Sequence, residues 1–163
     1  IKRSEGPFFQ SLYQIHKIIT LIFTGKKINF GNYSCLNKND TQLISTKKSL
    51  WSSYSGTVKK NLKKLNEVNS TRGMRYHGPS KMSLFKLLIH SFSIIAVFKY
   101  QVFFRSIIIL LILALTDFLN FSVSVSLQIL IVIFNIMIFV VSLRENQKEL
   151  FNSDKDLKDI ITL

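Results

Sequence analysis

Two long apolar segments constrain the fold more than any other feature of this chain of 163 residues. They are residues 103–119, FFRSIIILLILALTDFL, and residues 124–143, SVSLQILIVIFNIMIFVVSL. A helix of about 20 apolar residues can cross a hydrocarbon core about 30 Å thick. The second segment has that length, and the first reaches it if its helix begins near Tyr100 and Arg105 extends towards the interface. We therefore predict two transmembrane helices within residues 100–143.

The charges around these segments predict their orientation. The linker at 116–123 contains Asp117 and no Lys or Arg, whereas Lys99, Arg105 and Arg144 flank the outer ends. Because basic residues are retained on the cytoplasmic side, we expect a hairpin with both outer ends in the cytoplasm. Polar side chains within membrane helices usually contact protein rather than lipid. We expect this of two amides in the second segment, Gln128 and Asn135.

The region before the hairpin is strongly basic. Residues 1–105 contain 18 basic and 3 acidic side chains, whereas residues 144–163 contain 4 and 5. Such an excess favours nucleic acid, anionic lipid or a phosphorylated substrate as a partner. No zinc-finger spacing or other nucleic-acid motif is present, and the single cysteine, Cys35, excludes an internal disulfide. We therefore predict no nucleic-acid partner, and favour a membrane or a phosphorylated ligand.

Several shorter elements precede the apolar segments. Residues 7–24 predict an amphipathic helix, with Pro7 at its first turn and Gly25 just beyond its end. The apolar side chains of residues 28–35 predict a short extended stretch, interrupted by glycine. A helix over 41–49, capped by Asp40, and a second over 52–66 are also expected. Four lysines of the second helix are interpreted as a solvated face rather than a site: Lys59, Lys60, Lys63 and Lys64.

Residues 81–99 predict an amphipathic helix that lies flat at a membrane surface. Four residues at helical spacing form a polar stripe: Ser83, Lys86, His90 and Ser93. Four apolar residues cover the other side: Phe85, Leu88, Phe92 and Ile95. This arrangement would place the residues just before the helix at the level of the lipid headgroups.

The segment RGMRYHGPSKM, residues 72–82, contains the densest phosphate-binding chemistry in the chain. Arg75 offers a planar fork of donors for phosphate oxygens, and Lys81 supplies a compact charge. Ser80 can donate its hydroxyl and, if it caps the following helix, brings backbone N–H groups to the same point. The residues alone leave a second interpretation open. This segment could be a polybasic surface anchor, in which each cation contributes about 1 kcal/mol near anionic lipid.

The order Arg75-x-x-Gly78-x-Ser80-Lys81, followed by an interfacial helix and membrane spans, resembles the C-terminal part of membrane-bound family 2 glycosyltransferases. These include the polyprenyl-phosphate sugar synthases that are similar to dolichol-phosphate mannose synthase. KRSEG at residues 2–6 resembles the family's basic loop, and FTGKKINFGNYSCL at 23–36 resembles another of its segments. The resemblance covers about residues 2–105.

The resemblance implies an α/β fold, of which this chain holds the C-terminal portion of a GT-A-like domain. It also implies a lipid-phosphate or substrate site formed by five residues: Lys2, Arg3, Arg75, Ser80 and Lys81. The expected division has four parts: 1–80, the end of the catalytic domain; 81–99, the interfacial helix; 100–143, the two transmembrane helices; and 144–163, a cytoplasmic tail. Because the chain begins with Ile1, we interpret it as a piece of a longer polypeptide.

The implied activity is sugar transfer from a nucleotide-sugar donor to a polyprenyl phosphate or other lipid-linked acceptor. A divalent cation, Mg²⁺ or Mn²⁺, would be bound by residues absent from this chain, so no catalytic or metal-binding residue is predicted within it. The implied location is the bacterial inner membrane, as a multi-pass protein with its catalytic side cytoplasmic, and homo-oligomers are left open. Two alternatives remain at this point, a non-catalytic basic membrane adaptor and a small channel or transporter subunit.

Overall fold

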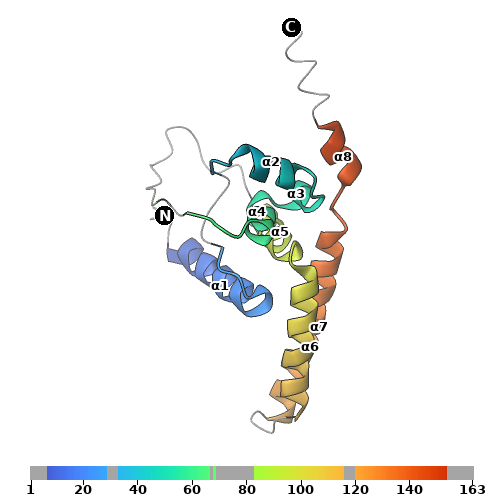
Figure 1. Cartoon of the computed structure of the whole chain (residues 1–163). Coiled ribbons are helices and arrows are strands. Elements are labelled where there is room, and N and C mark those ends of the chain that lie inside the picture. Colours follow the sequence, from blue (N-terminus) through green and yellow to red (C-terminus); the bar gives the residue numbers. More distant parts are fainter. Residues whose placement is uncertain (1–6, 29–32, 67, 69–82, 116–119, 154–163) are drawn as a thin grey trace.

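The computed structural model describes residues 7–28, 33–66, 68, 83–115 and 120–153. Every regular element in these ranges is a helix (Figure 1). Four helices precede the apolar hairpin: α1 (Pro7–Thr24), α2 (Lys38–Ser45), α3 (Ser49–Ser52) and α4 (Tyr54–Asn61). They are followed by α5 (Leu84–Ala96), α6 (Lys99–Leu115), α7 (Phe121–Ser142) and α8 (Gln147–Asn152).

The prediction of an α/β fold is therefore wrong. Residues 7–61 were expected to belong to a GT-A-like domain, yet their described part forms four helices and no strand. The extended stretch expected at 28–35 has no regular structure at Ile28 or from Tyr33 to Cys35, the positions that are described. A strand needs a neighbouring strand to satisfy its backbone N–H and C=O groups, and the described chain offers none.

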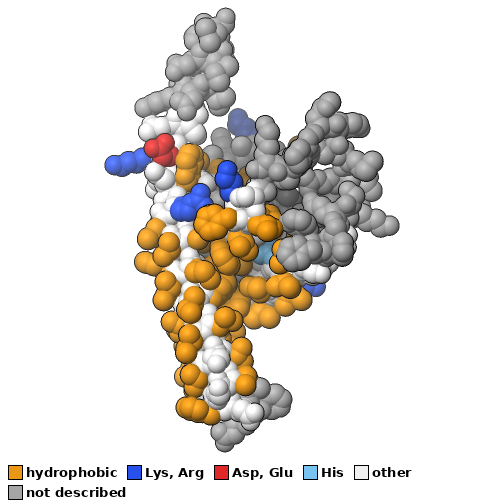
Figure 2. Space-filling model, turned by 180° about the vertical axis from the view of Figure 1, so that it is seen from behind, with side chains coloured by type: hydrophobic (Ala, Val, Ile, Leu, Met, Phe, Trp, Pro, Cys, Tyr) orange, Lys and Arg blue, Asp and Glu red, His pale blue; other side chains and the backbone are white. Residues whose placement is uncertain are grey.

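The long helices α6 and α7 form a pair that extends away from the other helices (Figure 1). The stretch Phe121–Asn152, which contains α7 and α8, is long and apolar enough to cross a membrane. The 17-residue α6 meets the same test only together with α5, from which it is bent by 87°. On the face in Figure 2, hydrophobic side chains cover the pair along its length, and charged side chains lie near the end that carries the other helices.

Two small hydrophobic cores hold the helices together. The first lies where α1, α5, α6 and α7 meet, around four buried residues: Ile95, Ala96, Val102 and Ile138. Phe23 of α1 packs against it and contacts Phe134 of α7, with 4.6 Å between ring centroids. The second core joins α2 and α4 through Ile44, Val58 and Leu62. The bend between α5 and α6 is anchored by Val97 and Phe98, each only 1% exposed.

The bounds of the helices agree with the sequence in part: the helix expected over 41–49 is α2, which ends at Ser45, and the helix expected over 52–66 is α4, which ends at Asn61. The helix expected over 7–24 is α1, and Gly25 follows it with a positive φ of 69°. The cap of α2 was assigned wrongly. The side chain of Asn37, not Asp40, accepts the capping hydrogen bond, and the donor is the backbone N–H of Asp40. Asp40 lies in the first turn of α2, where its negative charge interacts favourably with the positive end of the helix dipole.

The helix expected over 81–99 corresponds to α5, but its two faces are not those of a free surface helix. Phe85 and Leu88 are exposed, whereas Ile95 is buried against α6 and α7. Ser93 was placed on the polar stripe, yet it is buried and its hydroxyl donates to the carbonyl of Ile89 at 2.8 Å. Thus the first half of α5 presents an apolar face outwards, and its second half is part of the core.

Candidate functional site

The predicted phosphate site lies outside the described residues. This holds for all five of its members: Lys2, Arg3, Arg75, Ser80 and Lys81. Their role therefore stays a prediction. Ser83, which follows the segment, caps α5 by accepting a hydrogen bond from the backbone N–H of Lys86 at 3.3 Å.

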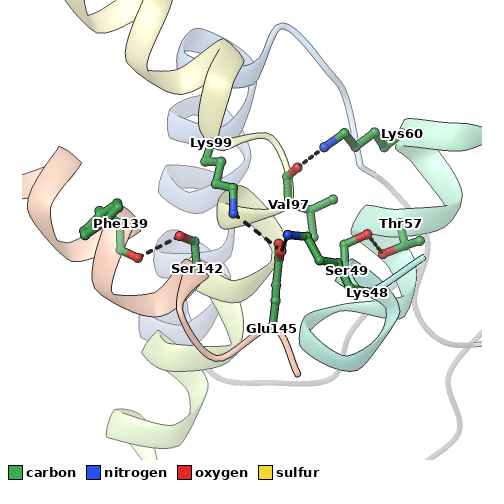
Figure 3. A network of polar contacts seen from close by, with 9 residues as sticks. All are labelled: Lys48, Ser49, Thr57, Lys60, Val97, Lys99, Phe139, Ser142 and Glu145. Carbon is green, nitrogen blue, oxygen red and sulfur yellow. Dashed lines mark hydrogen bonds and ion pairs between the residues drawn. The ribbon is translucent and has the colours of Figure 1, made fainter. Parts of the chain in front are cut away.

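The described residues contain a different cationic site, which we call the lysine cluster: Glu145, its ion-pair partners Lys48 and Lys99, and Lys60, which interacts with them electrostatically. These residues come from four separate parts of the chain, and in Figure 3 Lys48 and Lys99 point at Glu145 whereas Lys60 points at Val97. The carboxylate of Glu145 lies 3.4 Å from the ammonium of Lys99 and 3.8 Å from that of Lys48. The ammonium of Lys60 donates a hydrogen bond of 2.6 Å to the carbonyl oxygen of Val97.

The carboxylate is enclosed, and its cationic partners differ in exposure. The side chain of Glu145 is 7% exposed, that of Lys99 is 19% exposed and that of Lys48 is 60% exposed. A buried carboxylate requires a paired cation, and Lys99 is placed to fill this role. Lys48 adds a longer contact while most of its side chain stays in solvent. Three ammonium groups and one carboxylate leave the lysine cluster with a formal excess of two positive charges.

The pKa of Lys60 is lowered mainly by burial of its ammonium, because loss of water disfavours the charged form. Attraction to Glu145 raises the pKa, while repulsion from Lys99 and Lys48 lowers it. The carboxylate therefore does not cancel the unfavourable environment of the Lys60 ammonium. A bound anion would raise the pKa of Lys60, because an added negative charge stabilises the charged form of each lysine.

Close packing of α4 against α5 brings Lys60 to the bend. At Gly56 a Cβ atom would lie 3.0 Å from Cγ2 of Val97 and 3.1 Å from the carbonyl oxygen of Ile94. Only glycine leaves this space free without a shift of the neighbours. Ser53 caps α4 by accepting a hydrogen bond from the N–H of Gly56 at 3.2 Å. Lys60 thus reaches the last carbonyl of α5, where a cation is favoured by the helix dipole.

A second basic contact fixes α1 rather than forming a ligand site. Nη1 of Arg105 donates to the carbonyl oxygen of Ile22 at 3.2 Å, in the last turn of α1. A Cβ atom at Gly25 would lie 2.5 Å from Nη2 of the same guanidinium. The helix was expected to begin near Tyr100 if Arg105 extends towards the membrane interface, and α6 does begin at Lys99. Within α6, Arg105 contacts the last turn of α1; its extension towards an interface stays a prediction.

Metal ligands are not gathered in the described part of the chain. No group of three His, Cys, Asp or Glu side chains is arranged there to hold a metal ion. The divalent cation was predicted on residues outside this sequence, so that prediction is not tested.

His16 of α1 and His90 of α5 interact electrostatically. Burial is the main cause that lowers the pKa of each, and the neighbouring His90 lowers the pKa of His16 further.

Sequence reasoning missed the lysine cluster. Lys60 was assigned to a solvated face, Lys99 served only to orient the hairpin, and Glu145 was placed in the tail. A usable signal was present, because a tight antiparallel hairpin brings its two outer ends together. Lys99 and Glu145 flank those ends with opposite charge, so their contact could have been predicted from the hairpin, but it was not. The contributions of Lys48 and Lys60 depend on how α3 and α4 fold back, which no local pattern predicts.

Comparison with known proteins identified no relative of this chain. No family model, no curated protein and no solved structure matches this chain.

Proposed function

We propose that this chain holds the anionic headgroup of a membrane lipid at the lysine cluster while the lipid tail stays beside α6 and α7. The observation that carries the proposal is the position of the cluster. An excess of positive charge, with Lys60 in an unfavourable environment, lies at the end of a helix pair with an apolar surface. Ammonium groups attract phosphate as point charges, and the apolar surface suits hydrocarbon.

The specific form of this proposal is sugar transfer at a membrane. In it, the chain supplies the acceptor side of a glycosyltransferase and binds a polyprenyl phosphate or another lipid-linked acceptor. The nucleotide-sugar donor and the divalent cation would be held by residues outside this sequence. The sequence resemblance supports this form, and binding of the acceptor in a fixed position is its contribution to rate. Because the described part of the chain is helical, the proposal assigns it no nucleotide-binding sheet.

The proposed arrangement places both α6 and α7 across the membrane and α5 along its surface. The bend of 87° between α5 and α6 supports it, because a helix perpendicular to a spanning helix lies parallel to the bilayer. The exposed Phe85 and Leu88 would then enter the interface. The basic residues near the outer ends favour the cytoplasm for the lysine cluster.

A non-catalytic adaptor is the second candidate. The observation in its favour is that the described helices form an anchor and a cationic surface without any α/β domain. An adaptor needs only general attraction to anionic lipid, so its binding depends on total charge. A headgroup site depends instead on which lysines are present.

The experiment compares lysines inside and outside the cluster. The full chain, reconstituted in nanodiscs, is titrated with a polyprenyl monophosphate, with the corresponding polyprenol as the uncharged reference. We expect Lys48→Gln/Lys60→Gln to weaken binding of the phosphate about tenfold and to leave the polyprenol unchanged. The matched control removes the same charge from two exposed lysines elsewhere, Lys38→Gln/Lys63→Gln. Equal losses in both double variants would favour the adaptor.

A further inference from the structure

Helix α1 has apolar side chains on two opposite sides. One side packs into the first hydrophobic core through Ile19 and Phe23. The opposite side faces outwards, and four of its residues in the C-terminal half of the helix are 40–57% exposed: Ile15, Ile18, Leu21 and Ile22. A helix at the surface of a water-soluble domain has polar side chains on the side away from its core. The outward side of α1 therefore suits contact with an apolar environment.

The position of α1 relates this side to the apolar surface of the α6–α7 pair. Arg105 of α6 contacts the last turn of α1 through the carbonyl of Ile22. Arg105 follows Lys99, the first residue of α6, by six residues, which is about 9 Å along the helix axis. In Figure 1 the same end of α1 lies beside the pair, and on the face in Figure 2 the hydrophobic surface of the pair continues onto the helices next to it.

Two carbonyl groups at the C-terminal end of α1 are satisfied within the chain. The carbonyl of Leu21 accepts a hydrogen bond of 2.8 Å from the N–H of Gly25. The carbonyl of Ile22 accepts one of 3.2 Å from Arg105. The last carbonyls of a helix commonly bond to water, which the hydrocarbon of a bilayer does not provide. This end of α1 is therefore suited to an environment without water.

The outward side changes from polar to apolar along α1. Gln10, Gln14, Ile18 and Ile22 follow one another at intervals of four residues, so they lie along one side of the helix. All four are exposed. The first two suit water or lipid headgroups, and the last two suit hydrocarbon. The two halves of the helix therefore favour different depths in a membrane.

We propose that the C-terminal half of α1 lies among the acyl chains of the lipid bilayer, beside α6, while its N-terminal half stays among the headgroups. The slope of α1 in Figure 1 supports this placement, because its C-terminal end lies closer to the α6–α7 pair and to the far end of that pair. The ammonium of Lys17 lies 4.6 Å from the ring centre of Tyr13, one turn towards the polar half. A lysine in that position can extend its charge to the headgroups.

In this arrangement Arg105 sets the depth of α1. It holds the last turn about 9 Å below Lys99 along α6, and helices at an interface enter the bilayer by about 5–10 Å. The inference rests on α6 and α7 crossing the membrane, as in the proposed function. It does not require the headgroup site at the lysine cluster.

The test measures depth with spin labels on the full chain in phosphatidylcholine vesicles. Each variant carries one label in a Cys35→Ser background, at an exposed position: Gln10→Cys, Ile18→Cys, Lys38→Cys of α2 as the reference for water, or Ile133→Cys of α7 as the reference for the span. Collisions with oxygen and with a water-soluble nickel complex report depth. We expect the label at 18 to lie about 5–10 Å below the phosphates, deeper than the label at 10 and shallower than the label at 133.

The two reference labels separate this inference from the proposed function. If the label at 18 meets the nickel complex as often as the label at 38, while the label at 133 is protected, α1 lies in water and only this inference fails. If the label at 133 also meets the complex, the span fails as well. Equal depths at 10 and 18 would contradict the sloping placement. Circular dichroism should give equal helix content for all four variants.

Discussion

The ammonium of Lys60 donates a hydrogen bond of 2.6 Å to the carbonyl oxygen of Val97, the C-cap residue directly after α5. This contact joins α4 to the bend of 87° that leads into α6. The ammonium of Lys60 also interacts electrostatically with Lys99 and Lys48, whose repulsion contributes to its lowered pKa after burial, the main cause. The same side chain therefore stabilises the bend and adds to the positive charge of the lysine cluster.

Replacing Lys60 by methionine should destabilise the bend between α5 and α6 and lower the positive charge of the lysine cluster. The variant keeps most of the apolar length of the side chain but loses the hydrogen bond to Val97. We expect a loss of about 1 kcal/mol in the free energy of unfolding, as for a hydrogen bond made by a partly exposed charged group. Denaturant unfolding in detergent, followed by circular dichroism, measures this loss. Lys63→Met, a change at an exposed position, is the control and should leave stability unchanged.

Replacing Lys99 and replacing Glu145, the two partners of the buried ion pair, should lower the free energy of unfolding by different amounts. Lys99→Met leaves the carboxylate of Glu145, which is 7% exposed, with the exposed Lys48 as its remaining ion-pair partner, at the longer distance of 3.8 Å. Glu145→Gln removes the buried charge itself. We expect Lys99→Met to lower the free energy of unfolding by about 2–3 kcal/mol, and Glu145→Gln by less. If Glu145→Gln is the more destabilising change, the assignment of Lys99 as the partner required by the carboxylate is wrong.

Glu145→Gln should also strengthen anion binding, in contrast to its effect on stability. The substitution raises the formal excess of the lysine cluster from two to three positive charges. Titration of nanodiscs with a polyprenyl monophosphate should show tighter binding, with the largest gain at low salt, where screening is weakest. Weaker binding would indicate that Glu145 contacts the ligand or shapes its site.

The end of α1 gives a prediction about backbone geometry. Gly25 has a positive φ of 69°, and a Cβ atom there would lie 2.5 Å from Nη2 of Arg105. Gly25→Ala should cost about 1–2 kcal/mol from the backbone alone, with a further loss because the guanidinium must move. In the Arg105→Ala background only the backbone cost should remain. A double-mutant cycle of unfolding free energies measures the difference, and strictly additive effects would contradict the contact.

The two histidines predict a pH dependence of the contact between α1 and α5. Burial lowers the pKa of His16 and of His90 below the usual value, and the charge of His90 lowers that of His16 further. Above a pH of about 6.5 both the folded and the unfolded chain hold neutral histidines. As the pH falls below that value, the unfolded chain takes up protons first, so stability decreases. Thermal unfolding between pH 7.5 and 5.5 should show this fall, and His16→Gln/His90→Gln should reduce it.

Local patterns predicted most of the helices correctly. The period of the apolar residues in 7–24 and the Pro and Gly at its ends correspond to α1, and the two apolar segments correspond to α6 and α7. The amides Gln128 and Asn135 are both half-buried, as expected for polar side chains that face protein. These features depend on residues close together in the chain, which is why periodicity and end signals were sufficient.

The α/β prediction failed because it depended on short resemblances rather than on periodicity. The stretch 28–35 has residues that suit a strand, but no second strand was identified to pair with it. The five predicted site residues lie outside the described ranges, so their role is still a prediction. The lysine cluster could not be predicted in full, because it requires α4 to fold against the bend after α5. That contact depends on the close approach at Gly56, 41 residues before Val97 in the chain.

The most direct test of the headgroup site locates the phosphorus atom of a bound lipid. A spin label is attached through Arg144→Cys, next to the lysine cluster, or through Ser122→Cys, about 33 Å away along the helix, both in a Cys35→Ser background. Nanodiscs contain one polyprenyl monophosphate for each chain. We predict that the label at 144 broadens the ³¹P resonance, that the label at 122 does not, and that Lys48→Gln/Lys60→Gln abolishes the broadening. Equal broadening from both positions, or broadening unaffected by the loss of the two lysines, would contradict a headgroup site at the lysine cluster.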